Sequence, residues 1–320
     1  MASIKDVAKL AGVGLGTVSR VLNENGYVSI DARARVHAAM RQLNYTPNYS
    51  AQSLKRQKTR LVGLFVPTIN HPFFSKIAQY LENRFDEKGY KLMLVCSQGN
   101  AQKENSVINL IVQNRLDGAV FITHHRHDDI APEYPLVTLD RHLDKAIPCI
   151  TSDNFDSCYR AVKYLISRGC RKVGYLGGKP KVESEVEERL SGYRAAVKSC
   201  GMEERVLFEV IGHGDEAAYV KKFFESFPDA DGALISGDML AASAYHRAVA
   251  LGKRIPEDFK FVSFDGVVDS WFAGLRFTCI RQDLEKLSDA IVEQLICKIE
   301  GTDYQQMTVV PTLFEEGETT

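Results

Sequence analysis

Polar and aromatic side chains recur just after apolar runs of the sequence, where a chain leaves a buried strand. Ligands of open parallel sheets bind beyond the carboxyl ends of the strands. A polyhydroxyl ligand needs planar polar groups for its hydroxyls and an aromatic face for its C–H surface. Residues of both kinds are present, so the sequence predicts a site for such a small molecule. The candidates are His71, Phe73, Gln98, Asp153, Arg189, Asp238 and Asp265.

Three of these assignments have a structural alternative. Asp153 precedes an asparagine, and an Asp-Asn pair is also common in turns. Arg189 and Asp265 are far apart in the sequence, so they converge only in the folded chain. There they could bind a ligand together or form an ion pair with each other. Gln282 precedes the last long helical pattern, so we expect it near a crossing between lobes.

The run 124–129, with sequence HHRHDD, contains residue types that bind metals. His125 and His127, followed by two acids, could ligate zinc or nickel. However, an arginine interrupts the run and no distant partner cluster accompanies it. An exposed loop is therefore favoured, and we expect neither a metal nor a cofactor.

Apolar runs of strand character alternate with amphipathic helical patterns from about residue 61 onward. This alternation predicts parallel sheets covered by helices, and residues 61–320 are too many for one sheet, which favours two lobes. Strands are expected at 62–66, 92–95, 119–122, 136–139, 173–176, 233–235, 261–264 and 307–314. Helices are expected at 75–88, 103–114, 156–168, 216–227, 238–251 and 284–300.

The first 60 residues differ from the rest in charge. They hold ten lysines and arginines against three acids, a net +7, whereas the remaining chain holds 30 basic and 38 acidic residues, a net −8. A basic head on an acidic body indicates a polyanionic partner, although a solvated basic face would give the same balance. The pattern of residues within this head favours the polyanionic partner over a solvated basic face.

Three short helices are predicted in this head. Ser3 and Asp6 form a capping-box start, and a glycine-containing turn at 12–14 separates the first helix from a second at 17–22. Ser29 can cap a third helix, whose apolar residues between Ala32 and Leu43 lie on one face. This arrangement is a helix-turn-helix unit, a DNA-binding motif.

Composition excludes several other classes of protein. Hydrophobic residues make up 45% of the chain and charged residues 25%, which is ordinary for a globular protein. No apolar run approaches the ~20 residues of a membrane span. We see no secretion signal at the N-terminus, and seven scattered cysteines favour reduced thiols in a cytoplasm. The glycines of 174–178 do not form a G-x-G-x-x-G dinucleotide motif, and neither a P-loop nor G-x-S-x-G occurs, so we expect no enzyme.

These motifs together resemble the LacI/GalR family of transcription regulators. In the head the matching residues are 4–8 (IKDVA), 11–13 (AGV), 17–23 (TVSRVLN) and Leu43, Tyr45, Pro47 and Asn48. In the body they include 62–67, Pro72 to Phe74, Asp117-Gly118, Asp140-Arg141, Asp153-Asn154, Arg168-Gly169, Arg189, Gly192-Tyr193, Asp238, Phe264-Asp265 and Gln282. The resemblance therefore covers nearly the whole chain.

The resemblance implies a homodimeric regulator of double-stranded operator DNA, bacterial, cytoplasmic and associated with the nucleoid. The implied domains are a helix-turn-helix domain at 1–46, a hinge helix at 47–60 and a two-lobed body at 61–320, similar to periplasmic sugar-binding proteins. A small molecule bound between the lobes would set DNA affinity. The most favoured function is a repressor of carbohydrate-utilisation genes that responds to a sugar or phosphosugar.

The family pattern also implies which residues contact DNA. Leu15, Gly16 and Arg20 occupy the base-reading positions, and Arg20 suits guanine, with phosphate contact as its alternative. Leu54 of the hinge would insert into the minor groove, or otherwise only anchor the linker to the body. The full DNA-contacting set is Leu15, Gly16, Thr17, Ser19, Arg20, Asn23, Asn48, Ala51 and Leu54.

Departures from the family pattern leave the identity of the effector open. His71 and Gly237 stand where asparagine is common, and Gly214 stands near the place of a stacking aromatic. Trp271, the single tryptophan, could supply the missing stack and completes the effector set. A nucleobase, a nucleoside or a partner protein remains the alternative effector. A sugar-binding protein or an enzyme with a Rossmann-like body is the alternative class.

The charge division yields a first prediction. Deleting residues 1–60 should abolish gel retardation of DNA from upstream of the chain's own gene, because the basic residues that meet phosphates are removed. The remaining body should stay folded and dimeric by sedimentation. Retardation of DNA by the isolated body at moderate salt would contradict the assignment.

Overall fold

The computed structural model describes residues 2–22, 25–46, 58–98, 100–113, 115–122, 130–131, 133–144, 146–212, 214–267 and 274–320. The chain separates into two compact units, Met1–Thr59 and Arg60–Thr320. Their boundary falls inside the predicted linker, whereas the exact domain limits stay a prediction. The predicted hinge at 47–57 lies outside the described residues.

The first unit contains three helices in its described part, as the sequence predicts: α1 (Ile4–Ala11), α2 (Leu15–Leu22) and α3 (Ile30–Gln42). Ser3 and Asp6 form the predicted capping box, with the Ser3 amide donating to the Asp6 carboxylate at 2.8 Å. Ser29 caps α3 by accepting a hydrogen bond from the Ala32 amide. The apolar faces meet in one small core of Val7, Ala8, Ala11, Val18, Val21, Val36 and Ala39.

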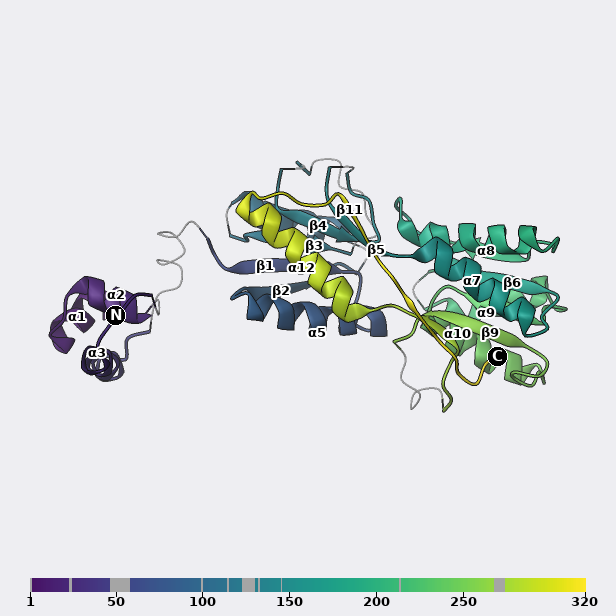
Figure 1. Ribbon diagram of the computed structural model, residues 1–320, viewed down its shortest axis with the longest axis horizontal. Helices are drawn as coiled ribbons and strands as arrows, with labels where there is room; N and C mark the ends of the chain where they lie inside the picture. The colour runs from purple at the N-terminus through teal and green to yellow at the C-terminus, as the bar shows by residue number, and fades with distance from the viewer. Residues whose placement is uncertain are drawn as a thin grey trace. The chain divides into compact units, whose positions relative to one another are not determined.

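The first lobe of the second unit is a parallel sheet covered on both faces. Its strands are β1 (Leu61–Val66), β2 (Lys91–Cys96), β3 (Gly118–Phe121), β4 (Leu136–Leu139), β5 (Cys149–Ser152) and β11 (Met307–Val310), in the order β11-β5-β4-β3-β1-β2. Alternate residues of β1 enter two cores, with Leu64 on one side and Phe65 on the other. Helices α5 (Pro72–Glu87) and α12 (Leu284–Glu300) pack against one face, and α6 (Ala101–Val112) packs against the other. Figure 1 shows α12 running beside α5.

The second lobe repeats this arrangement. Its strands are β6 (Val173–Gly178), β7 (Val206–Glu209), β8 (Gly232–Ile235), β9 (Lys260–Asp265), β10 (Cys279–Arg281) and β12 (Leu313–Glu315), in the order β12-β10-β9-β8-β6-β7. Helices α7 (Asn154–Ser167) and α8 (Glu188–Ser199) cover one face, and α9 (Glu216–Ser226) and α10 (Asp238–Ala250) cover the other. A 3₁₀ turn, η1 (Glu185–Glu187), leads directly into α8.

The chain passes between the lobes at three places: between β5 and α7, between β10 and α12, and between β11 and β12. The last passage corrects the expected single strand at 307–314. Pro311 interrupts that segment, and a proline offers no amide hydrogen to a ladder. The segment therefore divides, and β11 is parallel to β5 in one lobe while β12 is antiparallel to β10 in the other.

Two lobes with doubly wound sheets confirm the fold predicted from the sequence. The parallel pairing places the carboxyl ends of the strands of each lobe at one edge of its sheet, which is where the candidate effector residues stand. Within the described part of the chain, no helix is long and apolar enough to cross a membrane.

Candidate functional site

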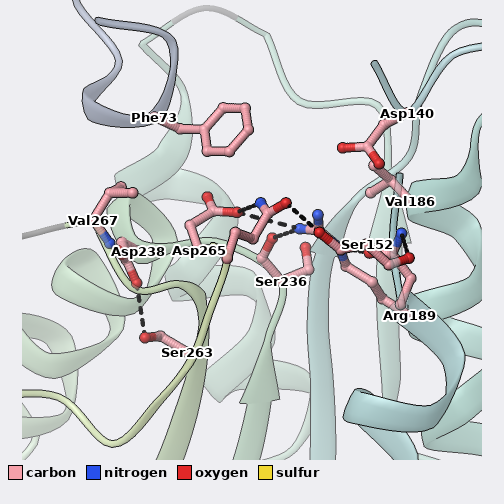
Figure 2. Close-up of polar contacts among 12 residues, drawn as sticks. Phe73, Asp140, Ser152, Val186, Arg189, Ser236, Asp238, Ser263, Asp265 and Val267 are labelled. Atoms are coloured by element: carbon pink, nitrogen blue, oxygen red, sulfur yellow. Dashed lines mark hydrogen bonds and ion pairs between the residues drawn. The ribbon is translucent and has the colours of Figure 1, made fainter. Parts of the chain in front are cut away.

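Buried polar side chains gather where the strands end and the chain passes between the lobes. This polar cluster comes from elements of both lobes and is drawn in part in Figure 2. Burying so many polar groups is favourable only when they are hydrogen-bonded, and each of them has a partner. Its members, each no more than 8% exposed, are Asp140, Ser152, Asn154, Arg189, Asp238, Asp265 and Gln282.

Arg189 of α8 contacts several polar groups and one aromatic ring. Its Nε donates to Asn154 Oδ1 at 2.8 Å, and its Nη1 donates to the Ser236 carbonyl at 2.9 Å. The guanidinium carbon lies 3.6 Å from the centre of the Phe264 ring, a cation–π contact. Its distance of 3.7 Å to Asp265 Oδ1 exceeds hydrogen-bond range. Arg189 and Asp265 are thus brought together, and the carboxylate acts as a nearby countercharge.

Gln282 joins the two lobes through its side-chain amide. Its Nε2 donates to Asp265 Oδ1 at 2.8 Å, and its Oε1 accepts from Ser152 Oγ at 2.8 Å. Ser152 ends β5 of the first lobe, whereas Asp265 ends β9 of the second. The expectation that Gln282 lies at a crossing between lobes is confirmed.

Asp265 combines a buried carboxylate with an unusual backbone conformation. Its backbone φ of 96° is unusual for a residue other than glycine. Burial raises the pKa of its carboxyl group, while Arg189 and the Gln282 amide act in the opposite direction and Asp140 adds to the rise. A raised pKa at a cluster of this kind is typical of functional sites.

Asp238 begins α10, and each of its two carboxylate oxygens accepts a hydrogen bond. Its Oδ1 accepts from Ser263 Oγ at 2.8 Å and its Oδ2 accepts from the Val267 amide at 2.6 Å. These contacts fix the carboxylate at the end of β9 (Figure 2).

The two aromatic candidates stand at the start of α5. His71 caps this helix, because its Nδ1 accepts from the Phe73 amide at 3.3 Å, which assigns the hydrogen to Nε2. Burial lowers the pKa of His71, and the nearby carboxylates of Asp238 and Glu216 oppose this effect. Phe73 is 5% exposed and packs edge-on against Phe74. Figure 2 shows the Phe73 ring toward the side of the cluster that carries Asp265.

Three other candidates are placed differently. Asp153 precedes α7: its Oδ1 accepts from the Thr312 amide at 2.8 Å, and its Oδ2 lies 3.0 Å from Arg160. It therefore ties two crossings together, a structural role different from the turn that its sequence also suggested. Gln98 is exposed after β2 with a φ of 51° and contacts Lys103. Trp271 lies outside the described residues.

Several members of the cluster were absent from the effector set predicted from the sequence. Asp140, Ser152 and Gln282 lie at the ends of strands and Asn154 begins α7, and β5 and β10 were not predicted. Asp140-Arg141, Asp153-Asn154 and Gln282 do occur among the family-like motifs, and the position of Gln282 before the last helical pattern was a further signal. The run at 124–129 also lies outside the described residues, and the described ranges contain no group of metal-binding side chains.

The candidate DNA-reading residues lie on α2. Leu15 and Gly16 begin this helix and are exposed, as is Arg20 near its end. Thr17 and Ser19 are half-buried, whereas Val18 and Val21 point into the core of the head. The helix thus presents a polar face with an apolar tip at its N-terminal end. Asn23, Asn48, Ala51 and Leu54 lie outside the described residues.

Comparison with known proteins matches both units to one family. Residues 3–48 match the bacterial regulatory proteins of the lacI family, and residues 59–315 match the periplasmic binding proteins and sugar-binding domain of the LacI family. The chain belongs to the LacI family. Members of this family are transcription regulators and not enzymes.

Individual relatives match over the full length of the chain. The chain is 33% identical to the ribose operon repressor of Halalkalibacterium halodurans, covering 94% of this chain and 91% of the relative. It is 32% identical to the sucrose operon repressor of Streptococcus mutans, covering 99% of both. A complex of the transcriptional regulator CelR with cellobiose matches with a TM-score of 0.73 at 27% identity, covering both chains completely. The Lac repressor dimer bound to operator shares the fold, with a TM-score of 0.83 at 22% identity over 99% of this chain and 98% of that one.

The environment of Asp265 predicts how this LacI-family protein responds to pH. An aspartate has a pKa of about 3.9 in an unfolded chain. Because burial raises the pKa of Asp265 in the folded state, the folded state binds its proton more tightly, and the free energy of unfolding falls as pH rises between the two values. Asp265→Asn removes this contribution. Relative to wild type, the variant should therefore gain about 1.4 kcal/mol for each unit of pKa difference as pH rises from below the unfolded-state pKa to above the folded-state pKa.

Urea unfolding followed by tryptophan fluorescence measures this effect. Trp271 is the single tryptophan of the sequence and belongs to the second unit, so this fluorescence contains no contribution from the head. A constant difference between the two proteins from pH 4 to pH 7 would show that the folded and unfolded pKa values of Asp265 are equal.

Proposed function

We propose that this LacI-family regulator is a repressor of carbohydrate-utilisation genes, which binds a pseudo-palindromic operator as a homodimer and responds to a small sugar or phosphosugar. It would act in the cytoplasm, at the nucleoid. The observation that carries the effector assignment is the polar cluster at the ends of the strands of both lobes. A ligand that meets groups of both lobes changes their relative position only through its differential affinity for the two arrangements.

The chemistry of the cluster supports a polyhydroxyl ligand. Asp238 and Asp265 offer carboxylate oxygens that accept from hydroxyls, and Arg189 offers donors in a fixed plane. Phe73 and His71 contribute ring surfaces from the other lobe, where the C–H face of a sugar can rest. The names of the relatives support the same class, because those proteins are repressors of ribose and sucrose operons.

We propose a smaller part in effector binding for the remaining residues that the sequence predicted. Asp153 is occupied by Thr312 and Arg160, and the exposed Gln98 contacts Lys103 rather than the cluster. Trp271 stays a sequence-based candidate for stacking. In contrast, Gln282 and Asn154 join the effector set through their contacts with Asp265 and Arg189.

Operator recognition is proposed for the exposed face of α2. Arg20 would read a guanine, Leu15 a thymine methyl group, and Gly16 would allow close approach of the helix to the bases. Thr17, Ser19 and Asn23 would bind phosphates. Asn48, Ala51 and Leu54 would form the hinge contact in the minor groove. Two copies are needed for a two-fold operator, because each chain carries one such head.

Arg20 provides a test of base reading. Arg20→Ala should weaken binding to the cognate operator by ~1–3 kcal/mol and relax the preference at one guanine, because a bidentate contact is lost. Selection from randomised operators, followed by fluorescence anisotropy at fixed salt, measures both effects. Arg41→Ala removes the same charge from α3 and is the matched control, expected to keep the base preference. An unchanged preference with Arg20→Ala would assign this residue to phosphate.

Arg189 provides a test of the effector site. A thermal-shift screen with D-ribose, sucrose, cellobiose, ribose 5-phosphate and adenosine should identify a sugar that stabilises the chain. Calorimetry with that sugar should show an affinity loss of about 10- to 100-fold in Arg189→Ala, because a charged hydrogen bond is removed. Operator binding should persist but no longer respond to the sugar.

The control is Arg194→Ala, five residues further along α8, where an exposed side chain pairs with Glu204. This variant should bind the sugar as wild type does. Normal sugar binding by an Arg189→Ala protein that unfolds more easily would make Arg189 structural. Stabilisation by adenosine alone would favour the nucleoside alternative.

A further inference from the structure

A short strip of each lobe is joined directly to the other outside the three chain crossings. In the first lobe the strip is residues 140–142, after β4, and in the second it is residues 183–185, before and within η1. The His142 amide donates to the Glu183 carbonyl, and the Glu185 amide donates to the Asp140 carbonyl, both at 3.1 Å. These bonds form an antiparallel bridge, which we call the latch.

Side chains strengthen the latch on both sides. Ser184 Oγ donates to the Asp140 carbonyl at 2.7 Å, and the buried Arg141 guanidinium donates to Ser184 Oγ. On the outer side His142 Nε2 lies 2.7 Å from Glu185 Oε1, with both side chains about one quarter exposed. The latch therefore has a buried inner part and an accessible outer pair.

The latch forms although Asp140 and Arg141 are each in an energetically unfavourable state. Asp140 has a left-handed φ of 59°, which is uncommon for a residue other than glycine. Arg141 is 8% exposed, and its Nε has no hydrogen-bond partner among the described residues. Such strain persists only where the surrounding structure holds it, and it concentrates at functional sites.

Two routes lead from the latch to Arg189. Along the chain, Glu185 begins η1, which continues into α8 and places Arg189 just beyond the turn. Through space, Thr151 Oγ1 donates to Asp140 Oδ1 at 2.6 Å, Asn154 Nδ2 donates to Thr151 Oγ1 at 3.0 Å, and Asn154 Oδ1 accepts from Arg189 Nε. Both routes begin at the latch and end at Arg189, so together they form a closed loop of contacts. This loop holds the side chain of Arg189 in place relative to the latch.

We propose that the latch positions Arg189 for the effector, so that the His142–Glu185 pair controls effector affinity without touching the effector. This inference rests on the proposed effector role of Arg189. A relative movement of the lobes that opens the latch would withdraw support from the first turn of α8. By linkage, an effector that requires Arg189 in place would in turn favour the latched arrangement.

Variants of the outer pair test this proposal without disturbing the buried cluster. Glu185→Ala and His142→Ala each remove one partner, and Glu185→Gln keeps an acceptor oxygen for His142 Nε2. Glu188→Ala is the matched control, because it removes an exposed carboxylate from the start of α8, next to the 3₁₀ turn and outside the latch. Operator binding by every variant checks that the chain is folded.

Hydrogen exchange of the full-length chain is the first measurement, and it needs no effector. Peptides covering 140–142 and 183–190 should exchange at least about tenfold faster in Glu185→Ala and His142→Ala than in wild type, because the bridge amides open more often. Exchange in Glu188→Ala and Glu185→Gln should stay close to wild type. Unchanged exchange at 183–190 in both alanine variants would overturn the proposal.

Calorimetry with the sugar selected by thermal shift is the second measurement. Each alanine variant should lose about threefold to tenfold in affinity, and the double variant should lose no more than the larger single loss, since the two residues act through one contact. Glu185→Gln should remain within about twofold of wild type. Faster exchange with unchanged sugar affinity would overturn the positioning role. If no sugar binds wild type, the proposed effector class fails, and exchange at the first turn of α8 still decides whether the latch holds Arg189.

Discussion

The arrangement of the body depends on the burial of one guanidinium group. Arg189 is almost entirely removed from water, and a buried charge is tolerated only with hydrogen-bond acceptors and a countercharge close by. Asn154, Ser236 and Asp265 supply these, and the ring of Phe264 covers its face. Those partners come from three separate segments, the start of α7 and the ends of β8 and β9, so satisfying one side chain fixes the ends of several elements together.

The same requirement explains why the polar cluster lies where the lobes meet. Parallel strands end at one edge of a sheet, so the polar residues that follow them collect there. Gln282 and Ser152 extend the network across the lobes, and Asp153 ties the passage into α7 to Thr312 of the last passage. The hydrogen bonds described between the lobes are made by polar groups at this edge, and of the second lobe's apolar residues Val267, just after β9, joins the apolar core of the first lobe. A molecule that exchanges hydrogen bonds with this network would therefore act on the relation between the lobes and leave their interiors intact.

Interactions between residues close in the sequence explain most of the helices and strands that could be predicted. The capping box at Ser3 and Asp6, the cap at Ser29 and the apolar faces of the head depend on neighbours within a few residues, so the three helices were predictable. Strands such as β4 and helices such as α12 were predicted at their observed bounds, because long apolar runs and periodic patterns are local signals. In contrast, β5, β7 and β10 are short strands whose apolar residues are too few to stand out. Helix α8 was not predicted, because its buried face includes Arg189 and Gly192, which interrupt the pattern of hydrophobic residues.

The sequence by itself determined the family, the basic head with its helix-turn-helix and the kinds of residue at the proposed effector site, because motifs and periodicities depend on residues close together in the sequence. Tertiary structure alone decided which of those residues meet. It brought Arg189 and Asp265 together, gave Asp153 a structural partner in Thr312, and added Asn154 and Gln282 to the cluster. It also divided the segment 307–314 between two sheets. The physical reason is that a side-chain hydrogen bond forms only when two atoms lie about 3 Å apart. The number of residues that separate the two partners in the sequence does not indicate whether the folded chain brings them that close.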